Sequence, residues 1–276
     1  MRGRAEDAAL IAPGLLLLLL AFFLPIAEVL VLSVRAPGAA GGPSLAQFGR
    51  FLGDSYYLGL AWRTLRLSAV ITLVCLALGF PLAYVMARAA PRLRLWLVVL
   101  TILPLMTSVV VRTFGWVVVL GRGGLVPRAL EALGLASQGV SLMHTETAIV
   151  IGMAQVLLPF MTLSILGVQM RIDPRLEEAA RTMGCGFWRA VAMVVVPASR
   201  PGIVSGSLLV FTLSISAFIT PSLLGGARLP VLAGSIYDTA TRTLDWPFAA
   251  AQSAILLFAV LLVLFPYVAA TRRRRG

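Results

Sequence analysis

Six long apolar stretches constrain what this chain folds into more than any other feature. A helix rises about 1.5 Å per residue, so roughly 20 apolar residues cross a bilayer core of about 30 Å. Because lipid offers no hydrogen-bond partners, each stretch must satisfy its own backbone, which favours helices. We therefore predict an all-α membrane protein with six transmembrane helices, at residues 10–34, 65–87, 95–120, 147–170, 203–220 and 248–270.

The composition agrees with a lipid environment. Hydrophobic residues make up 59% of the chain and charged residues 12%, whereas water-soluble domains average roughly 45–50% and about 25%. The net charge is +12, but nucleic-acid-binding chains are poor in apolar residues, so we expect no nucleic-acid partner. The loops are shorter than the usual domain minimum of about 50 residues. Residues 1–276 are thus predicted to form a single transmembrane domain.

The basic and metal-binding residues exclude several kinds of active site. Every one of the 23 basic residues is arginine, and a P-loop needs a lysine to neutralise the nucleotide phosphates. The single histidine, His144, excludes the two-histidine H-E-x-x-H zinc motif. Cys75 and Cys185 lie in different kinds of segment and indicate neither a disulfide framework nor a metal cluster. We expect no cofactor or metal in this chain, and no ATPase site.

The arginine distribution predicts the orientation. Arginines are concentrated at both chain ends and in the loops at 88–94 and 171–200. The positive-inside rule places these segments, and both termini, in the cytoplasm. The first stretch, at 10–34, is longer than the 7–15-residue core of a cleaved signal peptide, so we favour a retained span.

Several residues within the spans invite a functional interpretation. Each span has a proline in or at the end of its apolar run: Pro25, Pro81, Pro104, Pro159, Pro221 and Pro266. Such prolines form hinges in transporters, but proline is also common in ordinary membrane helices. Gly202 and Gly206 form a G-x-x-x-G pair for close helix approach, within the chain or against a partner. Arg112 lies deep in the third span, as part of a substrate path or as a snorkelling or ion-paired residue.

The longest inner loop, at 171–200, has a pattern of its own. Asp173 and Pro174 predict a helix start, and Gly184 predicts its end in a left-handed turn. Between them, Leu176, Ala179, Ala180 and Met183 recur at helical spacing and form one apolar stripe with small residues at its centre. Such a stripe fits a groove in another protein or the surface of the bilayer, and the pattern alone leaves both open.

This loop resembles the EAA signature of binding-protein-dependent ABC importer permeases: E-A-A, three residues, G, nine residues, I-x-L-P. Here Glu178-Ala179-Ala180 is followed by Gly184 and by Val194-Val195-Val196-Pro197, with the spacing kept. Val194 and Val196 replace Ile and Leu of the signature, and both changes keep an apolar residue. The resemblance implies a type I importer permease fold in the bacterial inner membrane, with the loop between helices 4 and 5 as the cytoplasmic coupling helix.

The resemblance also implies partners and roles. The loop would dock on a cytoplasmic ABC ATPase dimer that binds ATP and Mg²⁺, with a second, homologous but non-identical permease subunit and an extracytoplasmic substrate-binding protein completing the system. Glu178 would pair with a basic group of the ATPase, Ala179 and Ala180 would permit close approach, and Gly184 would set the bend. Met183 and Pro197 complete the coupling residues.

Further stretches resemble the spermidine/putrescine-type branch. They begin at Val111-Arg112-Thr113-Phe114-Gly115-Trp116, Phe218-Ile219-Thr220-Pro221, Ile236-Tyr237-Asp238 and Asp245-Trp246-Pro247. Carboxylates and aromatic faces suit a polycation, which favours Asp238, Asp245, Glu146, Tyr237 and Trp246. The candidate substrate-path residues are Arg112, Trp116, Tyr237, Asp238 and Trp246. Tyr237 and Trp246 also fit an interfacial aromatic belt, and Asp245 a helix cap. Arg112 suits a polycation poorly, so an amino-acid-like or anionic solute stays open.

Two other classes of function are disfavoured. Ser205 and Ser207 with His144 would suggest an intramembrane hydrolase, but the predicted topology puts the serines and the histidine on opposite sides of the bilayer. A passive channel needs only a lined pore and leaves the loop at 171–200 unexplained.

Overall fold

The computed structural model describes residues 3–35, 42–135, 137 and 139–272. In these residues the secondary structure is helical, apart from an isolated antiparallel bridge between Arg35 and Pro43. The chain divides into two compact units: Met1–Gly59 with Leu232–Gly276, and Leu60–Val231.

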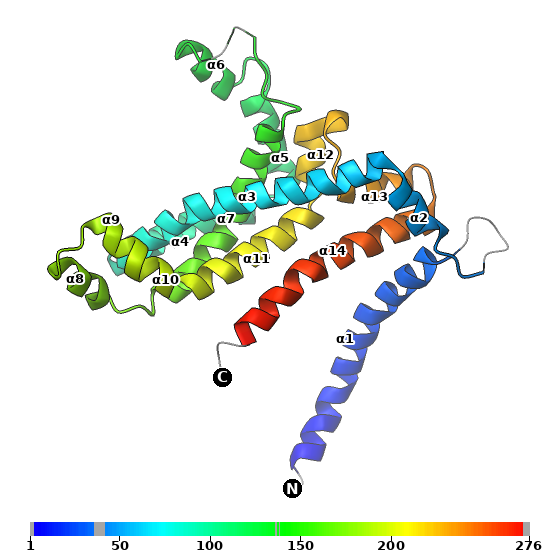
Figure 1. The fold of residues 1–276 in the computed structure, drawn as a ribbon, viewed down its shortest axis with the longest axis horizontal. Helices are drawn as coiled ribbons and strands as arrows, with labels where there is room; N and C mark the ends of the chain where they lie inside the picture. Colours follow the sequence, from blue (N-terminus) through cyan, green and yellow to red (C-terminus); the bar gives the residue numbers. More distant parts are fainter. Residues whose placement is uncertain (1–2, 36–41, 136, 138, 273–276) are drawn as a thin grey trace. The chain divides into compact units, whose positions relative to one another are not determined.

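The first unit joins the two ends of the chain. Its helices are α1 (Gly3–Ser33), α2 (Ala46–Gly53), α13 (Leu232–Thr241) and α14 (Trp246–Arg272), together with the first turn of α3 (Ser55–Arg88). Helix α14 packs along both α1 and α13 (Figure 1). Phe51 and Tyr57 stack at 5.7 Å between ring centroids, and Tyr57 meets the Phe248 ring edge-on at 5.0 Å. This aromatic cluster fixes α2 on the start of α14.

The second unit is built around one central helix, α7 (Glu146–Gln169). The elements before α7 are the rest of α3, α4 (Pro91–Ile102), η1 (Leu103–Met106), α5 (Val109–Leu120) and α6 (Leu125–Ala132). Those after it are α8 (Arg175–Thr182), α9 (Phe187–Ala190), the π-helical turn η2 (Val191–Val195), α10 (Val196–Ala198), α11 (Arg200–Ser216), α12 (Ile219–Gly225) and η3 (Gly226–Arg228). The core is made by apolar side chains of α3, α5, α7, α11 and α12.

Small residues bring the neighbours of α7 close to it. A Cβ on Gly202 of α11 would lie 2.9 Å from the Ser164 carbonyl oxygen, and one on Gly206 would lie 2.9 Å from the Met161 sulfur. A Cβ on Gly79 of α3 would lie 3.0 Å from Cγ of the same methionine. The G-x-x-x-G pair therefore serves packing within the chain, of α11 on α7, which the sequence had left open.

Among the residues that the structure describes, five helices are long and apolar enough to cross a bilayer, and six if one bent pair counts as a single span. The five are Ala12–Ser33, Ser55–Arg88, Val109–Ala132, Glu146–Gln169 and Trp246–Phe265; the bent pair is Phe187–Ala198 with Arg200–Ser216, at 70°. The all-α, multi-span prediction is confirmed. Four of the predicted spans, those at 10–34, 65–87, 147–170 and 248–270, each fall on one continuous helix.

Two predicted spans are wrong in detail. The one at 95–120 is broken: α4 ends at Ile102, a short 3₁₀ turn follows, and α5 starts only at Val109. The one at 203–220 ends early, because α11 stops at Ser216 and α12 begins at Ile219. Of the flagged prolines, Pro104 lies at the first break, whereas Pro25, Pro81 and Pro159 lie inside continuous helices. A hydropathy profile shows how apolar a stretch is, but it does not show where the backbone changes direction. These breaks therefore could not be predicted from the apolar runs.

Candidate functional site

The loop at 171–200 folds as the sequence predicted, into a short helix with a glycine turn. The Asp173 carboxylate accepts a hydrogen bond at 2.9 Å from the amide of Arg175, the first residue of α8. At the other end Gly184 has φ +89°, its amide donates to the Arg181 carbonyl, and the Cys185 amide donates to the Ala180 carbonyl. These two bonds form a Schellman motif, in which the left-handed position favours glycine.

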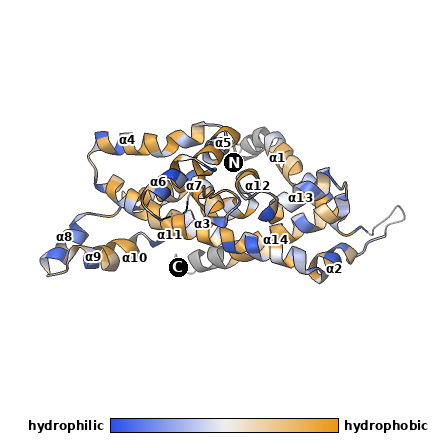
Figure 2. Cartoon of the chain, turned by 90° about the horizontal axis from the view of Figure 1, so that it is seen from above, coloured by the Kyte–Doolittle hydropathy of each residue, from blue (hydrophilic) through white to orange (hydrophobic). Residues whose placement is uncertain are grey.

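One face of α8 is open to its surroundings. Glu178 and Ala179 are exposed, as is Met183 at 80%, and Trp188 of the next helix is exposed at 82%. In the part of the chain that the structure describes, the Glu178 carboxylate has no hydrogen-bond or ion-pair partner. Figure 2 shows α8 as mostly hydrophilic, in contrast to α4. Methionine and aromatic residues are enriched where proteins contact one another, so the exposed Met183 and Trp188 make this face suited to contact with another protein.

The other face of α8 carries a residue that sequence reasoning did not single out. Glu177 is 8% exposed. Its Oε1 accepts the Tyr84 hydroxyl at 2.7 Å, and its Oε2 accepts the Arg88 Nε at 3.1 Å and also pairs with Nη2 of that arginine. The Arg88 guanidinium lies 3.6 Å above the Tyr84 ring. The sequence around the two adjacent glutamates does not indicate which of them is buried.

After the glycine turn, the chain returns to the membrane helices through a bend. The π-helical turn Val191–Val195 leads into α10, and α10 meets α11 at 70°. Pro197 and Pro201 flank the junction, where the Ser199 side chain is fully buried. The π-turn departs from regular α-helical hydrogen bonding, and each proline lacks an amide donor. The local sequence therefore favours a bend in this segment.

The ion pair at Glu177 predicts a pH dependence of stability. Burial raises the pKa of Glu177, but the hydrogen bonds from Tyr84 and Arg88 and the arginine charge lower it by more, so it lies below its ordinary value. A depressed folded-state pKa stabilises the fold above the unfolded carboxyl pKa of about 4.3, and this is lost as pH falls through the folded value. We expect the Tm difference between the native protein and Glu177→Gln to be constant above about pH 5 and to shrink on acidification. A Tm difference that grows below pH 4 would contradict this.

Two of the five substrate-path candidates lie one turn apart on α5. Arg112 Nη1 donates to the Pro104 carbonyl at 2.7 Å, which the Thr107 hydroxyl also approaches at 2.7 Å. Arg112 therefore bridges the break between η1 and α5. Its Nε is buried and has no acceptor among the described residues. The Trp116 indole donates to the Gln155 side chain of α7 at 3.2 Å.

Two of the stretches that resemble the spermidine/putrescine-type branch, at 111–116 and 218–226, contact each other in the structure. The Thr113 and Thr220 hydroxyls are 3.1 Å apart and buried, which joins α5 to α12. A Cβ on Gly152 of α7 would reach within 2.4 Å of a Leu224 methyl group. The segments at 111–116 and 218–226 thus form one packed layer on α7.

The remaining candidates lie in the first unit. Tyr237 and Asp238 are on α13, and Trp246 begins α14; all three side chains are exposed. Asp238 pairs with Arg242, the residue that follows the end of α13, at 3.0 Å. Arg112 and Trp116 therefore lie in the second unit, and the other three candidates lie in the first.

Asp245 caps the start of α14, which is one of the two roles that the sequence left open for it. Its Oδ1 accepts the Phe248 amide at 3.2 Å, and its Oδ2 pairs with Arg50 at 2.7 Å. We expect Asp245→Ala to cost about 1 kcal/mol and to lower Tm by roughly 2–4 °C. Asp238→Ala, which removes an exposed pair without a cap, is the control and leaves Tm unchanged. Equal shifts in both variants would contradict the capping role.

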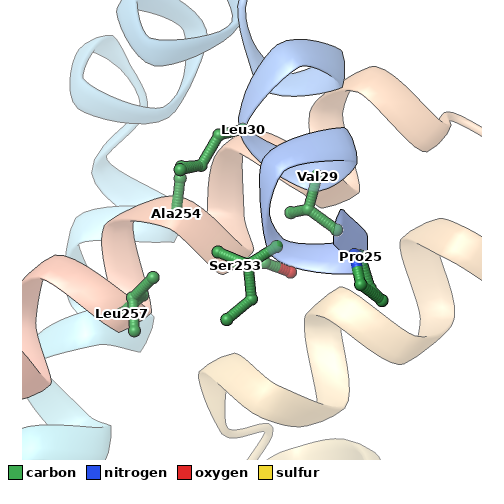
Figure 3. A pocket seen from close by; sticks show the side chains of 7 residues that line it. Pro25, Val29, Leu30, Ser253, Ala254 and Leu257 are labelled. Carbon is green, nitrogen blue, oxygen red and sulfur yellow. The ribbon is translucent and has the colours of Figure 1, made fainter. Parts of the chain in front are cut away.

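An apolar groove lies within the first unit, between α1 and α14 (Figure 3). It has a volume of about 260 Å³ and is lined by Pro25, Ile26, Val29, Leu30, Ser253, Ala254 and Leu257. Its one hydroxyl, on Ser253, already donates to the Ala249 carbonyl at 2.9 Å. The groove therefore lacks the polar groups that would select a charged solute.

The family model described as the binding-protein-dependent transport system inner membrane component matches residues 79–275. This match covers α7, the whole EAA-like loop, and α11. The chain belongs to this family. It is a multi-pass inner-membrane permease of the ABC importer type, and the resemblance read from its loop is confirmed.

Several curated relatives are permease proteins. The permease is 32% identical over 258 residues to the spermidine/putrescine transport system permease protein PotB of Haemophilus influenzae, covering 92% of this chain and 90% of that one. It is 31% identical to PotB of Escherichia coli, covering 83% of each. It is also 33% identical to the molybdenum transport system permease protein ModB of Mycobacterium bovis, over 71% of this chain and 73% of that one.

The fold has solved counterparts. A bacterial ABC transporter that imports the acidic polysaccharide alginate superposes with a TM-score of 0.80 at 18% identity, covering 96% of this chain and 94% of that one. The same transporter in complex with its alginate-bound periplasmic protein superposes equally well. At this identity the likeness shows the fold alone, which confirms the type I permease fold.

Proposed function

We propose that this permease is one of two non-identical membrane subunits of an importer that carries a polyamine, spermidine or putrescine, into the cytoplasm. Separate ATPase subunits supply the energy, and an extracytoplasmic binding protein delivers the solute. The observation that carries the mechanism is the α8 loop: an EAA pattern folded as helix, left-handed glycine turn and helix, with Glu178 exposed and unpaired in the described structure.

The division of labour follows from the side chains that the sequence contains. A P-loop lysine is absent from the sequence, so ATP and Mg²⁺ bind on partner subunits. Docking of the exposed α8 face on an ATPase dimer would convert closure of that dimer into movement of the attached membrane helices. The arginine-rich ends and inner loops place α8 and both termini in the cytoplasm.

Support for a polyamine comes from the PotB relatives, which match most of the chain. Among the described residues, Asp238, Asp245 and Glu146 are each paired with an arginine, so they add little negative potential for a polycation. A second candidate is an anionic solute. It is favoured by Arg112, whose buried Nε lacks an acceptor in the described part of the chain, and the ModB relative shows that related permeases serve other cargo.

The test is uptake by the complete system. The permease, its second permease, the ATPase and the binding protein are reconstituted in liposomes, and uptake of radiolabelled spermidine is followed with and without ATP. We expect uptake only with ATP and the binding protein, and competition by unlabelled putrescine. Uptake that persists without ATP would overturn the energised mechanism. Spermidine that neither enters nor binds to the binding protein would overturn the polyamine assignment.

A further inference from the structure

Helix α8 is joined to the membrane helices by two bent connections. Before it, the five residues 170–174 link it to α7. After it come the left-handed Gly184, the π-turn Val191–Val195 and the 70° bend into α11. None of these connections is a continuous helix, so the chain alone gives α8 a compliant attachment. A force applied to its exposed face would tilt it unless something else holds it.

Glu177 supplies a third attachment, to a different helix. Its carboxylate is held by the Tyr84 hydroxyl and by two nitrogens of Arg88, both on the last turns of α3. Phe187 of α9 meets the Tyr84 ring edge-on at 6.0 Å, so the second short helix contacts the same point. Charge-assisted bonds in a largely buried setting are short and directional, which makes this attachment stiff.

The anchor on α3 is itself fixed. The Arg94 guanidinium donates to the carbonyls of Met86, Ala87 and Ala89, at 2.9 to 3.1 Å, where α3 ends. Further along, Gly79 lets α3 approach Met161 of α7 closely. Because the end of α3 is held in this way, we expect a displacement of Arg88 to move the whole of α3 and not only its last turn.

The two neighbouring glutamates thus face in different directions. Successive helical residues are about 100° apart around the axis, and Glu178 is exposed whereas Glu177 is buried against α3. One glutamate meets whatever docks on α8, and the other meets the membrane helices.

We propose that Glu177 is a positioning residue for transport: with Arg88 and Tyr84 it ties α8 to α3, so that displacement of α8 moves α3 together with α7 and α11. This inference rests on the proposed function, in which an ATPase subunit displaces α8. Without the tie, part of the displacement is absorbed as tilting of α8, and ATP is hydrolysed without a full movement of the membrane helices.

The test measures solute taken up per ATP hydrolysed in the reconstituted complete system, with spermidine as the probe. For Glu177→Gln, whose amide nitrogen opposes the arginine, we expect the ratio to fall at least about fivefold, the lower end of usual coupling between sites. Tyr84→Phe removes one hydroxyl only and should give a smaller fall. Glu177→Arg combined with Arg88→Glu restores the pair in reverse, and we expect it to recover the ratio.

Arg66→Gln is the matched control. Arg66 also lies on α3 and pairs with a glutamate of α7, but both side chains are 40–49% exposed, so its loss should leave the ratio unchanged. If the tie serves folding alone, the amount of complex, its ATPase activity and its uptake fall together and the ratio stays as in the native protein, which would overturn the proposal. If Glu177→Gln fails to accumulate, Tyr84→Phe decides: a native ratio overturns the proposal.

The two proposals fail in different ways. A native complex without ATP-dependent uptake of spermidine would refute the proposed function and, with it, this inference. A native complex that transports normally, with an unchanged ratio in the Glu177 and Tyr84 variants, would refute the tie and leave the proposed function standing.

Discussion

Glu178→Arg is expected to abolish ATP-driven uptake while the protein still inserts in the membrane. Glu178 lies on the exposed face of α8 and makes no contact that holds the described fold together. If it pairs with a basic group of the ATPase, reversing its charge sets two like charges against each other. Such a juxtaposition costs several kcal/mol, more than about 100-fold in affinity. The measurements are spermidine uptake and the amount of ATPase that co-purifies with the permease.

Glu178→Gln provides the graded comparison, because it removes the charge without introducing repulsion. Uptake should fall less than with arginine, in the order native, glutamine, arginine. The amount of permease in the membrane should be equal in all three, since the contacts of Glu177 with α3 are untouched. Native uptake by the arginine variant would show that α8 does not dock through this face.

Gly202→Leu is expected to prevent stable accumulation of the protein. A Cβ at this position would lie 2.9 Å from the Ser164 carbonyl oxygen and 3.0 Å from the Ile165 Cα, both backbone atoms of α7. Relief requires α11 to move away from α7 and to lose the packing of the core. Inserting even smaller groups into a packed interior costs about 1–3 kcal/mol, and leucine should exceed this. The measurements are membrane yield and Tm in detergent.

Gly167→Leu is the control for the same helix pair. Gly167 lies on α7, is exposed, and a Cβ there would meet nothing within 4 Å. The same change of residue should therefore leave yield and Tm close to native. A Gly202→Leu protein that accumulates and melts like the control would contradict the close approach of α7 and α11.

The parts of the fold that were predictable depend on near neighbours in the chain. Apolar runs located the helices α1, α3, α7 and α14 because burial in lipid needs only length and hydropathy. Asp173 and Gly184 located the ends of α8, because an Asx-type bond and a left-handed turn involve residues two to five apart. The EAA spacing identified the family for the same reason.

The parts that were missed depend on residues far apart in sequence or on backbone direction. The break between η1 and α5 falls on Thr107 and Ser108, inside the predicted span at 95–120. It is bridged by the hydrogen bond from Arg112 to the Pro104 carbonyl, which the sequence does not indicate. The substrate-path candidates were chosen by residue type. The structure divides them between two units and pairs Asp238 with Arg242, four residues further along the chain.

What the sequence alone determined is the membrane class, the family, and the shape of the loop at 171–200, which depends on local caps and turns. Only the tertiary structure decided that Gly202 and Gly206 pack on α7, and that Glu177 rather than Glu178 turns toward α3. The physical reason is that a helix's pattern defines its faces, but its rotation about its own axis is set by what packs against it. For α8 that neighbour is the end of α3, which lies 89 to 93 residues away along the chain.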